Sequence, residues 1–164
     1  MLKLTKKADY GLIALKHLSG RYQAAGLERS ASAKEISDAY GIPLALLSKI
    51  LQRLCKAGFL VSEHGTNGGY RLARDPKNIT ALQVIREIDG PIILTACFTE
   101  HGACSQSETC TVREPLRKVH EGILSLLSNI SISSMSEEDG ADPEPVRLYD
   151  VELSSGTLQS APRV

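Results

Sequence analysis

Three of the four cysteines in this 164-residue chain lie in one short polar segment. They are Cys97, Cys104 and Cys110, with six residues in the first gap and five in the second. Thiolate sulfur is a ligand that soft metals and iron–sulfur clusters prefer. The gaps are longer than the roughly two to four residues that separate paired cysteines in zinc fingers, which disfavours structural zinc without excluding it. The spacing therefore predicts a metal or iron–sulfur site and leaves the metal open.

The composition indicates the compartment in which these thiols work. With 42% hydrophobic and 23% charged residues, the chain is typical of a soluble globular protein. No apolar run approaches the roughly 18 residues that cross a bilayer, and Asp9 interrupts the N-terminal apolar stretch. We expect a cytoplasmic protein with no membrane partner. Thiols stay reduced there, so a cysteine cluster indicates metal or redox chemistry rather than disulfides.

Charge is unevenly distributed, although the formal net charge is zero. Residues 1–74 hold twelve Lys and Arg against five Asp and Glu, a balance of +7. Residues 75–134 come to −2 and residues 135–164 to −5 by the same count. A basic first half predicts a polyanionic partner, and solvated charged faces are the alternative. We find no Gly-rich dinucleotide loop, no CxxC pair and no catalytic His/Asp constellation, so an enzyme is not expected.

Residues 1–75 are predicted to begin with two helices separated by a loop. The first helix covers about 5–22 and carries an apolar stripe. Ser32 caps the second, shorter helix, and Glu35 three residues later completes a capping box. Gly41 suits the left-handed end of that helix. The boundaries of the short helix are therefore predicted from local chemistry alone.

A third helix and a hairpin complete the predicted DNA-binding region. Pro43 opens the helix where its missing N–H costs nothing, and Gly58 ends it. Two short helices joined by a glycine turn are typical of a helix-turn-helix. The segment that follows, FLVSEHGTNGGYRLAR, predicts a β-hairpin, which in this position is a wing. The inward face of the third helix is expected to consist of Leu44, Leu47, Leu51 and Leu54.

Polar residues on the outer face of the third helix, at the second helix and on the wing are candidates for contacts with DNA. Their side chains hydrogen-bond to bases and phosphates. A solvated helix face and a structural hairpin are the alternatives for each part. Combined with the positive charge, the pattern predicts binding to double-stranded DNA. The set is Ser32, Ser48, Lys49, Gln52, Arg53, His64, Tyr70 and Arg71.

Residues 76–134 are predicted to hold a short helix, the cysteine loop and a long helix. The short helix covers 80–89. Thr111 and Glu114 form a second predicted capping box, from which the long helix continues to about Ile130. The apolar stripe of the long helix could pack within the chain or pair with a second copy. Helix-turn-helix proteins bind two half-sites as dimers, so we expect a homodimer and a near-palindromic operator. Residues 135–164 are acidic and rich in Ser, Gly and Pro, and are expected to form a disordered tail. The apolar stripe of the long helix is Leu116, Val119, Ile123, Leu126, Leu127 and Ile130.

From residue 1 to about 135 the sequence resembles the Rrf-type winged-helix regulators, the family of IscR and NsrR. The resemblance rests on LTKKADYGL, LSKILQRLCKAGFL, GTNGGYRLAR and the spaced cysteines. The stretch GPIILTAC, the cysteine loop and CTVRE are most similar to regulators of SUF-type iron–sulfur assembly operons. The resemblance implies a mainly α fold, with a winged helix-turn-helix, a cysteine-rich cluster loop and a long C-terminal dimerisation helix. It also implies a homodimeric transcription factor whose cluster state tunes its affinity for DNA.

The resemblance further implies that the three cysteines of the loop bind a [2Fe-2S] or [4Fe-4S] cluster. The first gap is one residue longer than in IscR and NsrR. Arg113 stands where IscR has a histidine ligand, and a guanidinium cannot ligate. In NsrR-like members an aspartate of the first helix supplies the fourth ligand from the other subunit, and Asp9 matches it; a helix-start acid favoured by the dipole is the alternative. His101 is a rival ligand, and Cys55 is expected to be a packing cysteine.

The sequence is compatible with two functions. The first is an iron–sulfur-dependent DNA-binding regulator, a repressor of SUF-type cluster assembly genes. The second is a regulator of the same fold whose cysteines act as a thiol switch or zinc site without iron. The presence or absence of iron distinguishes them.

Overall fold

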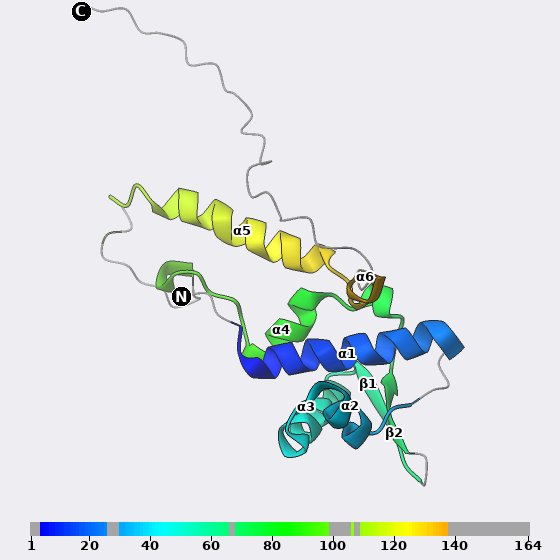
Figure 1. The fold of residues 1–164 in the computed structure, drawn as a ribbon. Helices are drawn as coiled ribbons and strands as arrows, with labels where there is room; N and C mark the ends of the chain where they lie inside the picture. Colours follow the sequence, from blue (N-terminus) through cyan, green and yellow to red (C-terminus); the bar gives the residue numbers. More distant parts are fainter. Residues whose placement is uncertain (1–3, 26–29, 66–67, 99–105, 107–108, 138–164) are drawn as a thin grey trace, which may run out of the picture.

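The computed structural model describes residues 4–25, 30–65, 68–98, 106 and 109–137. The protein is mainly helical with one two-stranded sheet (Figure 1), which confirms the predicted fold class. No helix in these ranges is long and apolar enough to cross a bilayer. In chain order the elements are α1 (Lys6–Ala25), α2 (Ala33–Tyr40), α3 (Leu44–Lys56), β1 (Leu60–Glu63), β2 (Gly69–Leu72), the 3-10 helix η2 (Pro76–Asn78), α4 (Ala81–Asp89), the 3-10 helix η3 (Ala96–Phe98), α5 (Arg113–Asn129) and α6 (Ile132–Glu137).

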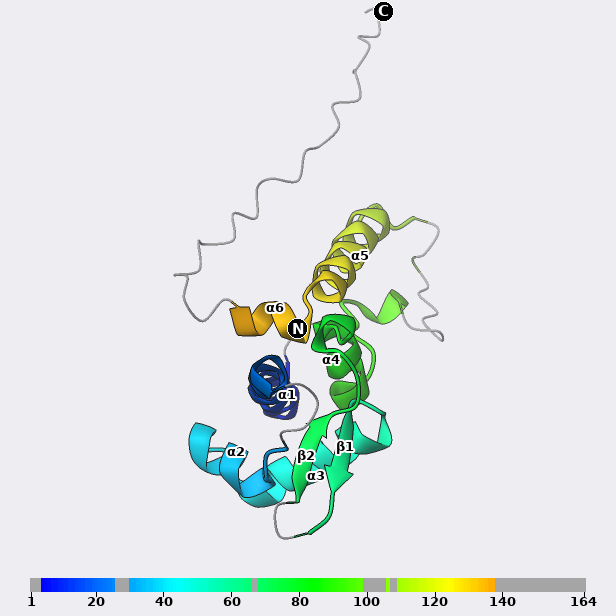
Figure 2. The ribbon, with the colours of Figure 1, turned by 90° about the vertical axis from the view of Figure 1, so that its right-hand side faces the viewer.

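Helix α1 lies at the centre of the molecule. Figures 1 and 2 show α2, α3 and the β1–β2 hairpin on one side of it and α5 on the opposite side, with α4 and α6 beside it. Buried side chains from α1, α3, α4 and α6 form one hydrophobic cluster, so the helix-turn-helix and the C-terminal helices share a core. The predicted helix-turn-helix and wing and α5 are thus held on opposite sides of α1 in one packed unit.

The predicted helix ends agree with the structure where a single side chain decides them. The Ser32 hydroxyl accepts a hydrogen bond from the Glu35 N–H at 3.1 Å and caps α2. Gly41 ends this helix with φ +63°, a left-handed conformation that favours glycine. Thr80 and Gln83 form a complete capping box at the start of α4.

Two capping boxes predicted from the sequence are not formed. At α2 only the Ser32 half exists, because the Glu35 carboxylate binds Arg21 of α1 instead. At α5 the box between Thr111 and Glu114 is wrong. The helix begins at Arg113, its cap residue makes no side-chain hydrogen bond, and the Glu114 carboxylate binds Arg117 one turn on. In both cases an arginine at hydrogen-bonding distance outcompetes a neutral backbone N–H for the carboxylate.

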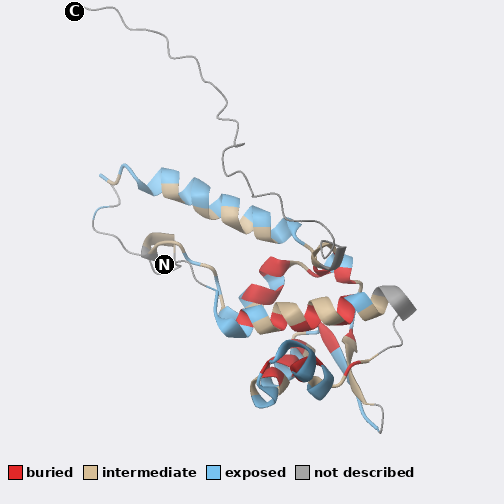
Figure 3. Cartoon of the chain, in the orientation of Figure 1, coloured by how far each residue is buried: buried red, intermediate tan, exposed pale blue. Residues whose placement is uncertain are grey.

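The buried face of α3 comprises Leu47, Ile50, Leu51 and Leu54 (Figure 3). Leu44, expected on that face, is instead 43% exposed in the first turn of the helix. Helix α6 was not predicted; its Ile132 is fully buried and its N–H donates to the Ile79 carbonyl at 2.9 Å. Helical structure therefore continues through 137, and the remainder of the expected tail lies outside the described residues.

Candidate functional site

A groove of about 650 Å³ lies between the start of α2, the outer side of α3 and the wing. The structure brings four of the predicted DNA-contacting residues together along it: Ser32, Gln52, His64 and Tyr70. Lys56 lines it as well, one helical turn beyond Gln52. A concave surface with amide, hydroxyl, imidazole and ammonium groups suits the edge of a nucleic acid.

The backbone docks the wing against the segment that enters α2. Ala31 and Tyr70 exchange N–H···O bonds of 2.9 and 2.8 Å, which forms an isolated β-bridge beside β2. A side chain at Gly69 would lie 2.6 Å from the Ala31 carbonyl oxygen, so only glycine allows this approach. The bridge fixes the wing relative to the helix-turn-helix.

Four of the predicted contacts on α3 differ in their surroundings. Lys49 and Gln52 are exposed on the outer side of the helix, and Ser48 is half-buried. Arg53 makes hydrogen bonds within the protein: it donates to the Glu87 carboxylate at 3.2 Å and to the Ile88 carbonyl at 3.1 Å, both on α4. Lys49 and Gln52 are thus exposed, and Arg53, although its side chain is 53% exposed, is partly engaged with α4.

On the wing, Arg71 also has a partner within the protein. Its Nε donates to the Glu63 carboxylate at 2.6 Å, across the β1–β2 pair. His64 is exposed at the end of β1, next to the turn. His64 is thus placed to meet a ligand, whereas Arg71 would have to share its guanidinium between Glu63 and a phosphate.

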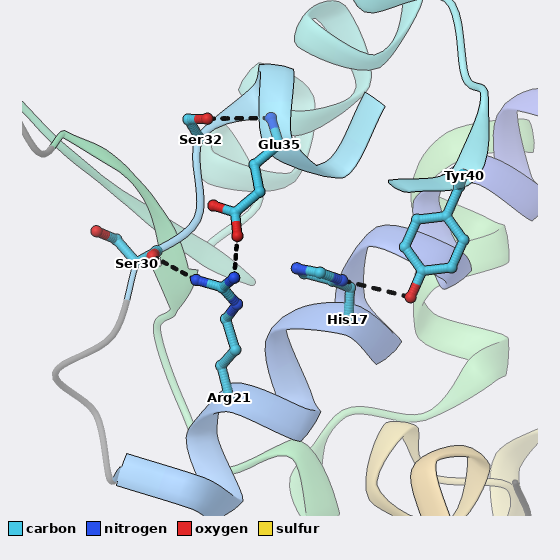
Figure 4. Close-up of polar contacts among 6 residues, drawn as sticks. All are labelled: His17, Arg21, Ser30, Ser32, Glu35 and Tyr40. Carbon is cyan, nitrogen blue, oxygen red and sulfur yellow. Dashed lines mark hydrogen bonds and ion pairs between the residues drawn. The ribbon is translucent and has the colours of Figure 1, made fainter. Parts of the chain in front are cut away.

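A polar cluster connects α1 to α2 (Figure 4). Arg21 binds Glu35 and donates to the Ser30 carbonyl at 3.2 Å, while His17 Nδ1 lies 3.3 Å from the Tyr40 hydroxyl. Burial, then the nearby Arg21, lowers the pKa of His17; Glu35 opposes the shift. Sequence reasoning missed this cluster. Its members are far apart in the chain, and Glu35 alone gave a signal, as a capping residue.

Two cysteines of the loop lie in the described residues, and Cys104 and His101 lie outside them. Cys97 is half-buried in η3, with its Sγ 3.0 Å from the Thr95 hydroxyl oxygen. Cys110 is half-buried three residues before α5. Both are free thiols. Within the described ranges no three potential ligands converge as a metal site.

The loop is attached to α5 by an aromatic contact. The rings of Phe98, beside Cys97, and His120 of α5 lie 5.3 Å apart between centroids at an angle of 32°. The start of α5 carries Arg117 between Glu114 and Glu121, and a hydrogen bond from Arg117 lowers the pKa of Glu114. The N-cap residue of α5, Val112, makes no side-chain hydrogen bond to the helix, and the N–H groups of the first turn form a partial positive charge three residues after Cys110.

Asp9 is exposed in the first turn of α1. This helix end is fixed to α4, because Thr5 donates to the Asp89 carboxylate from its N–H at 3.0 Å and from its hydroxyl at 2.5 Å. Asp9 faces solvent on a rigid element, so its carboxylate is accessible to a second chain. The fourth cysteine, Cys55, packs against the core, and burial raises the pKa of its thiol, which agrees with a packing role.

Part of the apolar stripe of α5 faces the core and part of it faces solvent. Leu127 packs on the core, whereas Val119 is 52% and Leu126 is 63% exposed. No residue of α5 is buried within the described chain. The outer part of the stripe is thus an unpartnered apolar face.

Residues 4–138 match the Rrf2 family, described as iron-dependent transcriptional regulators. CymR, the global cysteine regulator of B. subtilis, is 25% identical, with a TM-score of 0.69 over 84% of this chain and 98% of that chain. A putative transcriptional regulator from Listeria innocua is 25% identical, with a TM-score of 0.70 over 97% and 96% of the two chains. T. potens IscR is 27% identical, with a TM-score of 0.61 over 84% and 88%. The chain belongs to the Rrf2 family of DNA-binding transcriptional regulators.

Proposed function

We propose that this regulator is an iron–sulfur-dependent repressor of SUF-type cluster assembly genes, which binds a near-palindromic operator as a homodimer. The observation that carries the proposal is the pair of half-buried free thiols, Cys97 and Cys110, that flanks a third cysteine in an iron-dependent family. The likeness to an IscR supports it.

The residue types of the cysteine loop fit a cluster. Cys97, Cys104 and Cys110 would hold it, with Asp9 from a second copy as the fourth ligand. The Thr95 hydroxyl lies where it can donate to the Cys97 sulfur, and the uncapped start of α5 favours negative charge near Cys110. When bound, an iron–sulfur cluster supplies reversible electron transfer and sensitivity to oxidants.

The outer face of α5 supports the homodimer. Leu116, Val119, Ile123, Leu126 and Ile130 follow one another at steps of three and four residues, the repeat of a two-helix seam. Pairing of two copies along this seam would cover Val119 and Leu126. It would also place two DNA-reading units at the far ends of one assembly, as two half-sites require.

Contacts of this chain's own residues connect the loop to the DNA-reading helix. Phe98 stacks on His120 of α5, and α5 packs on α4. Helix α4 in turn holds Arg53 of α3 through Glu87 and the Ile88 carbonyl. A change of loop conformation therefore has a continuous packed route to α3.

Anaerobic purification with measurement of visible absorption, iron and sulfide tests the proposal. We expect a coloured protein whose affinity for a selected operator changes when iron is removed. Serine at 97, 104 or 110 should abolish the colour and leave a folded protein. Cys55→Ser is the matched control and should keep it. A colourless, iron-free protein whose DNA binding responds to thiol oxidation or zinc would favour the thiol-switch or zinc alternative.

A further inference from the structure

The first turn of α3 exposes apolar side chains. Pro43, Leu44 and Ala45 are all exposed, and Leu44 remains 43% accessible although the other leucines at three- and four-residue steps along the helix are buried. Ala45, Lys49 and Gln52 follow at steps of four and three residues, so Ala45 continues the outward stripe toward the start of the helix. Ala45 therefore presents its methyl group on the side of α3 that carries the polar DNA-contacting residues, whereas Leu44 is exposed at the N-terminal end of the helix, in line with the buried leucines.

This position has a defined role in a helix-turn-helix. The N-terminal residues of the recognition helix reach the base edges in the major groove. In α3 the first side chain that can form a hydrogen bond is Ser48, in the second turn. The part of the helix expected to reach deepest thus has no side-chain donor or acceptor with which to read a base.

The chemical groups in the major groove of DNA then favour one base as the partner of an apolar side chain. Thymine presents a C5 methyl group beside its O4 acceptor in the major groove, whereas the other three bases present only donors and acceptors there. An apolar side chain against those polar groups would desolvate them without a partner, which is costly. Against the thymine methyl, the same side chain gains contact and excludes water.

We infer that Leu44 and Ala45 determine operator specificity by packing on thymine methyl groups in the major groove. The inference rests on the recognition role of α3 in the proposed function. A single exposed leucine is ordinary on a protein surface. Leu44 differs because it lies in the first turn of α3, the part of the helix that is expected to meet the base edges, and this turn has no polar side chain.

The test uses operator DNA in which deoxyuridine replaces thymidine one position at a time. Uracil keeps the Watson–Crick pairing and lacks the methyl. The operator is first selected with the full-length wild-type protein, and dissociation constants are measured by fluorescence anisotropy. Loss of one contacted methyl should weaken binding about fourfold, and about sixteenfold when both half-sites are changed. Leu44→Ala and Ala45→Ser should bind thymine and uracil operators with nearly equal affinity at the affected positions.

Val61→Ala is the matched control, because Val61 is a similarly exposed apolar residue that lies on the wing. It should retain the full preference for thymine. If the wild-type protein loses no affinity when any single thymine is replaced by uracil, the inference is overturned. Equal losses in wild type and in both α3 variants would overturn it too, since the methyl would then act through DNA shape or another residue. Failure to select any site would refute recognition by α3, whereas specific binding that ignores iron would refute only the cluster-dependent function.

Discussion

Arg53 of α3 donates to the Glu87 carboxylate of α4 at 3.2 Å, and its guanidinium also reaches the Ile88 carbonyl at 3.1 Å. The next residue, Asp89, receives both hydrogen bonds from Thr5 at the start of α1. The C-terminal turn of α4 therefore holds α3 and the end of α1 near Asp9, immediately before the segment that leads to Cys97. This turn is the structural junction between the DNA-reading end and the cysteine loop.

Arg53→Ala should lower stability. It removes an exposed ion pair and a hydrogen bond to a main-chain carbonyl, together worth about 1–2 kcal/mol. Glu87→Gln should cost less, about 0–1 kcal/mol, because it leaves the Ile88 contact in place. Urea denaturation measures both changes. Lys56→Ala, an exposed cation on the same helix, is the control and should change the free energy of unfolding little.

Lys49→Ala and Gln52→Ala should show the opposite behaviour. Both side chains are exposed on the outer face of α3, so stability should be retained. Loss of a base contact should weaken operator binding by about 1–3 kcal/mol, and loss of a phosphate contact should also reduce the salt dependence. Anisotropy titrations at several salt concentrations separate these effects. Full affinity in the double variant would show that α3 does not read DNA through these residues.

The folded protein should lose stability as the pH falls below about 6.5. The pKa of His17 lies below its ordinary value of 6.5 in the folded state, so the unfolded chain binds the proton more readily. The stabilising contribution is thus present above 6.5 and is lost as the pH falls toward the folded-state pKa. Structurally, the His17 Nε2 atom is buried without a hydrogen-bond partner in the described part of the chain, and Arg21 lies close.

Chemical denaturation between pH 5 and 8 would measure this dependence for wild type and His17→Gln. The variant should lose the component of the slope that belongs to His17. Tyr40→Phe is the control: it removes the hydroxyl near His17 and keeps the titrating ring, so the slope should persist. An unchanged slope in His17→Gln would assign acid sensitivity to other groups.

Gly69→Ala should displace the wing. The added methyl would lie 2.6 Å from the Ala31 carbonyl oxygen, so the Ala31–Tyr70 bridge must open, at a cost of about 1–3 kcal/mol. DNA affinity should fall with it, because His64 moves with the hairpin. Gly20→Ala is the control: Gly20 lies exposed within α1 with open space around it, and alanine should stabilise the helix by about 0.5–1 kcal/mol. Thermal melts and operator titrations would compare the two.

The parts of the fold that the sequence predicted are those set by neighbouring residues. Ser32, Gly41 and Thr80 determine helix ends through their own side chains or backbone, and apolar steps of three and four residues identified most of the buried face of α3. Contacts between residues far apart in the chain could not be predicted from local sequence, and the wrong predictions arose from such contacts. Glu35 is a good capping residue until Arg21, fourteen positions away, takes its carboxylate.

The same limit applies to the site. Residue type and position marked Arg53 as a DNA contact, and they gave no sign of its partner Glu87, which lies on α4, thirty-four positions away. Helix α6 is only six residues long and polar in sequence, and its burial against the rest of the core is what forms it. The cysteines were found from sequence because metal ligands are restricted to a few residue types. Their spacing alone gave no information on the fourth ligand.

Substitution of glutamate for Leu126 should prevent dimerisation. A carboxylate buried without a partner in an α5 seam would cost several kcal/mol, hence at least about a hundredfold in the dimer dissociation constant. The monomer should remain folded, because Leu126 is 63% exposed within one chain. Sedimentation velocity measures the change, and Ser128→Glu, an exposed polar position of α5, is the control. A dimer unaffected by Leu126→Glu would place the interface elsewhere.

Asp9→Ala should alter the cluster without altering the fold. The carboxylate is exposed and makes no hydrogen bond or ion pair to another described residue, so its removal costs no internal contact. If Asp9 is a ligand, the visible spectrum of the anaerobic protein should shift and its colour should fade faster in air, because a thiolate-only site lacks the fourth bond. Asp38→Ala, an exposed acid on α2, should leave the spectrum unchanged. A wild-type spectrum from Asp9→Ala would make His101 the next candidate.

Mixed dimers decide whether Asp9 acts across the subunit interface. One subunit carries Asp9→Ala and the other carries serine at 97, 104 and 110. If Asp9 ligates in trans, the intact cysteines of the first subunit meet the intact aspartate of the second, and one normal site forms per dimer. If it ligates in cis, no complete site remains. The reciprocal dimer pairs wild type with a subunit that has all four substitutions. There the outcomes exchange: ligation in trans leaves no complete site, and ligation in cis leaves one. Agreement of both dimers with the trans pattern is the expected result, and a normal spectrum in the reciprocal dimer alone would contradict it.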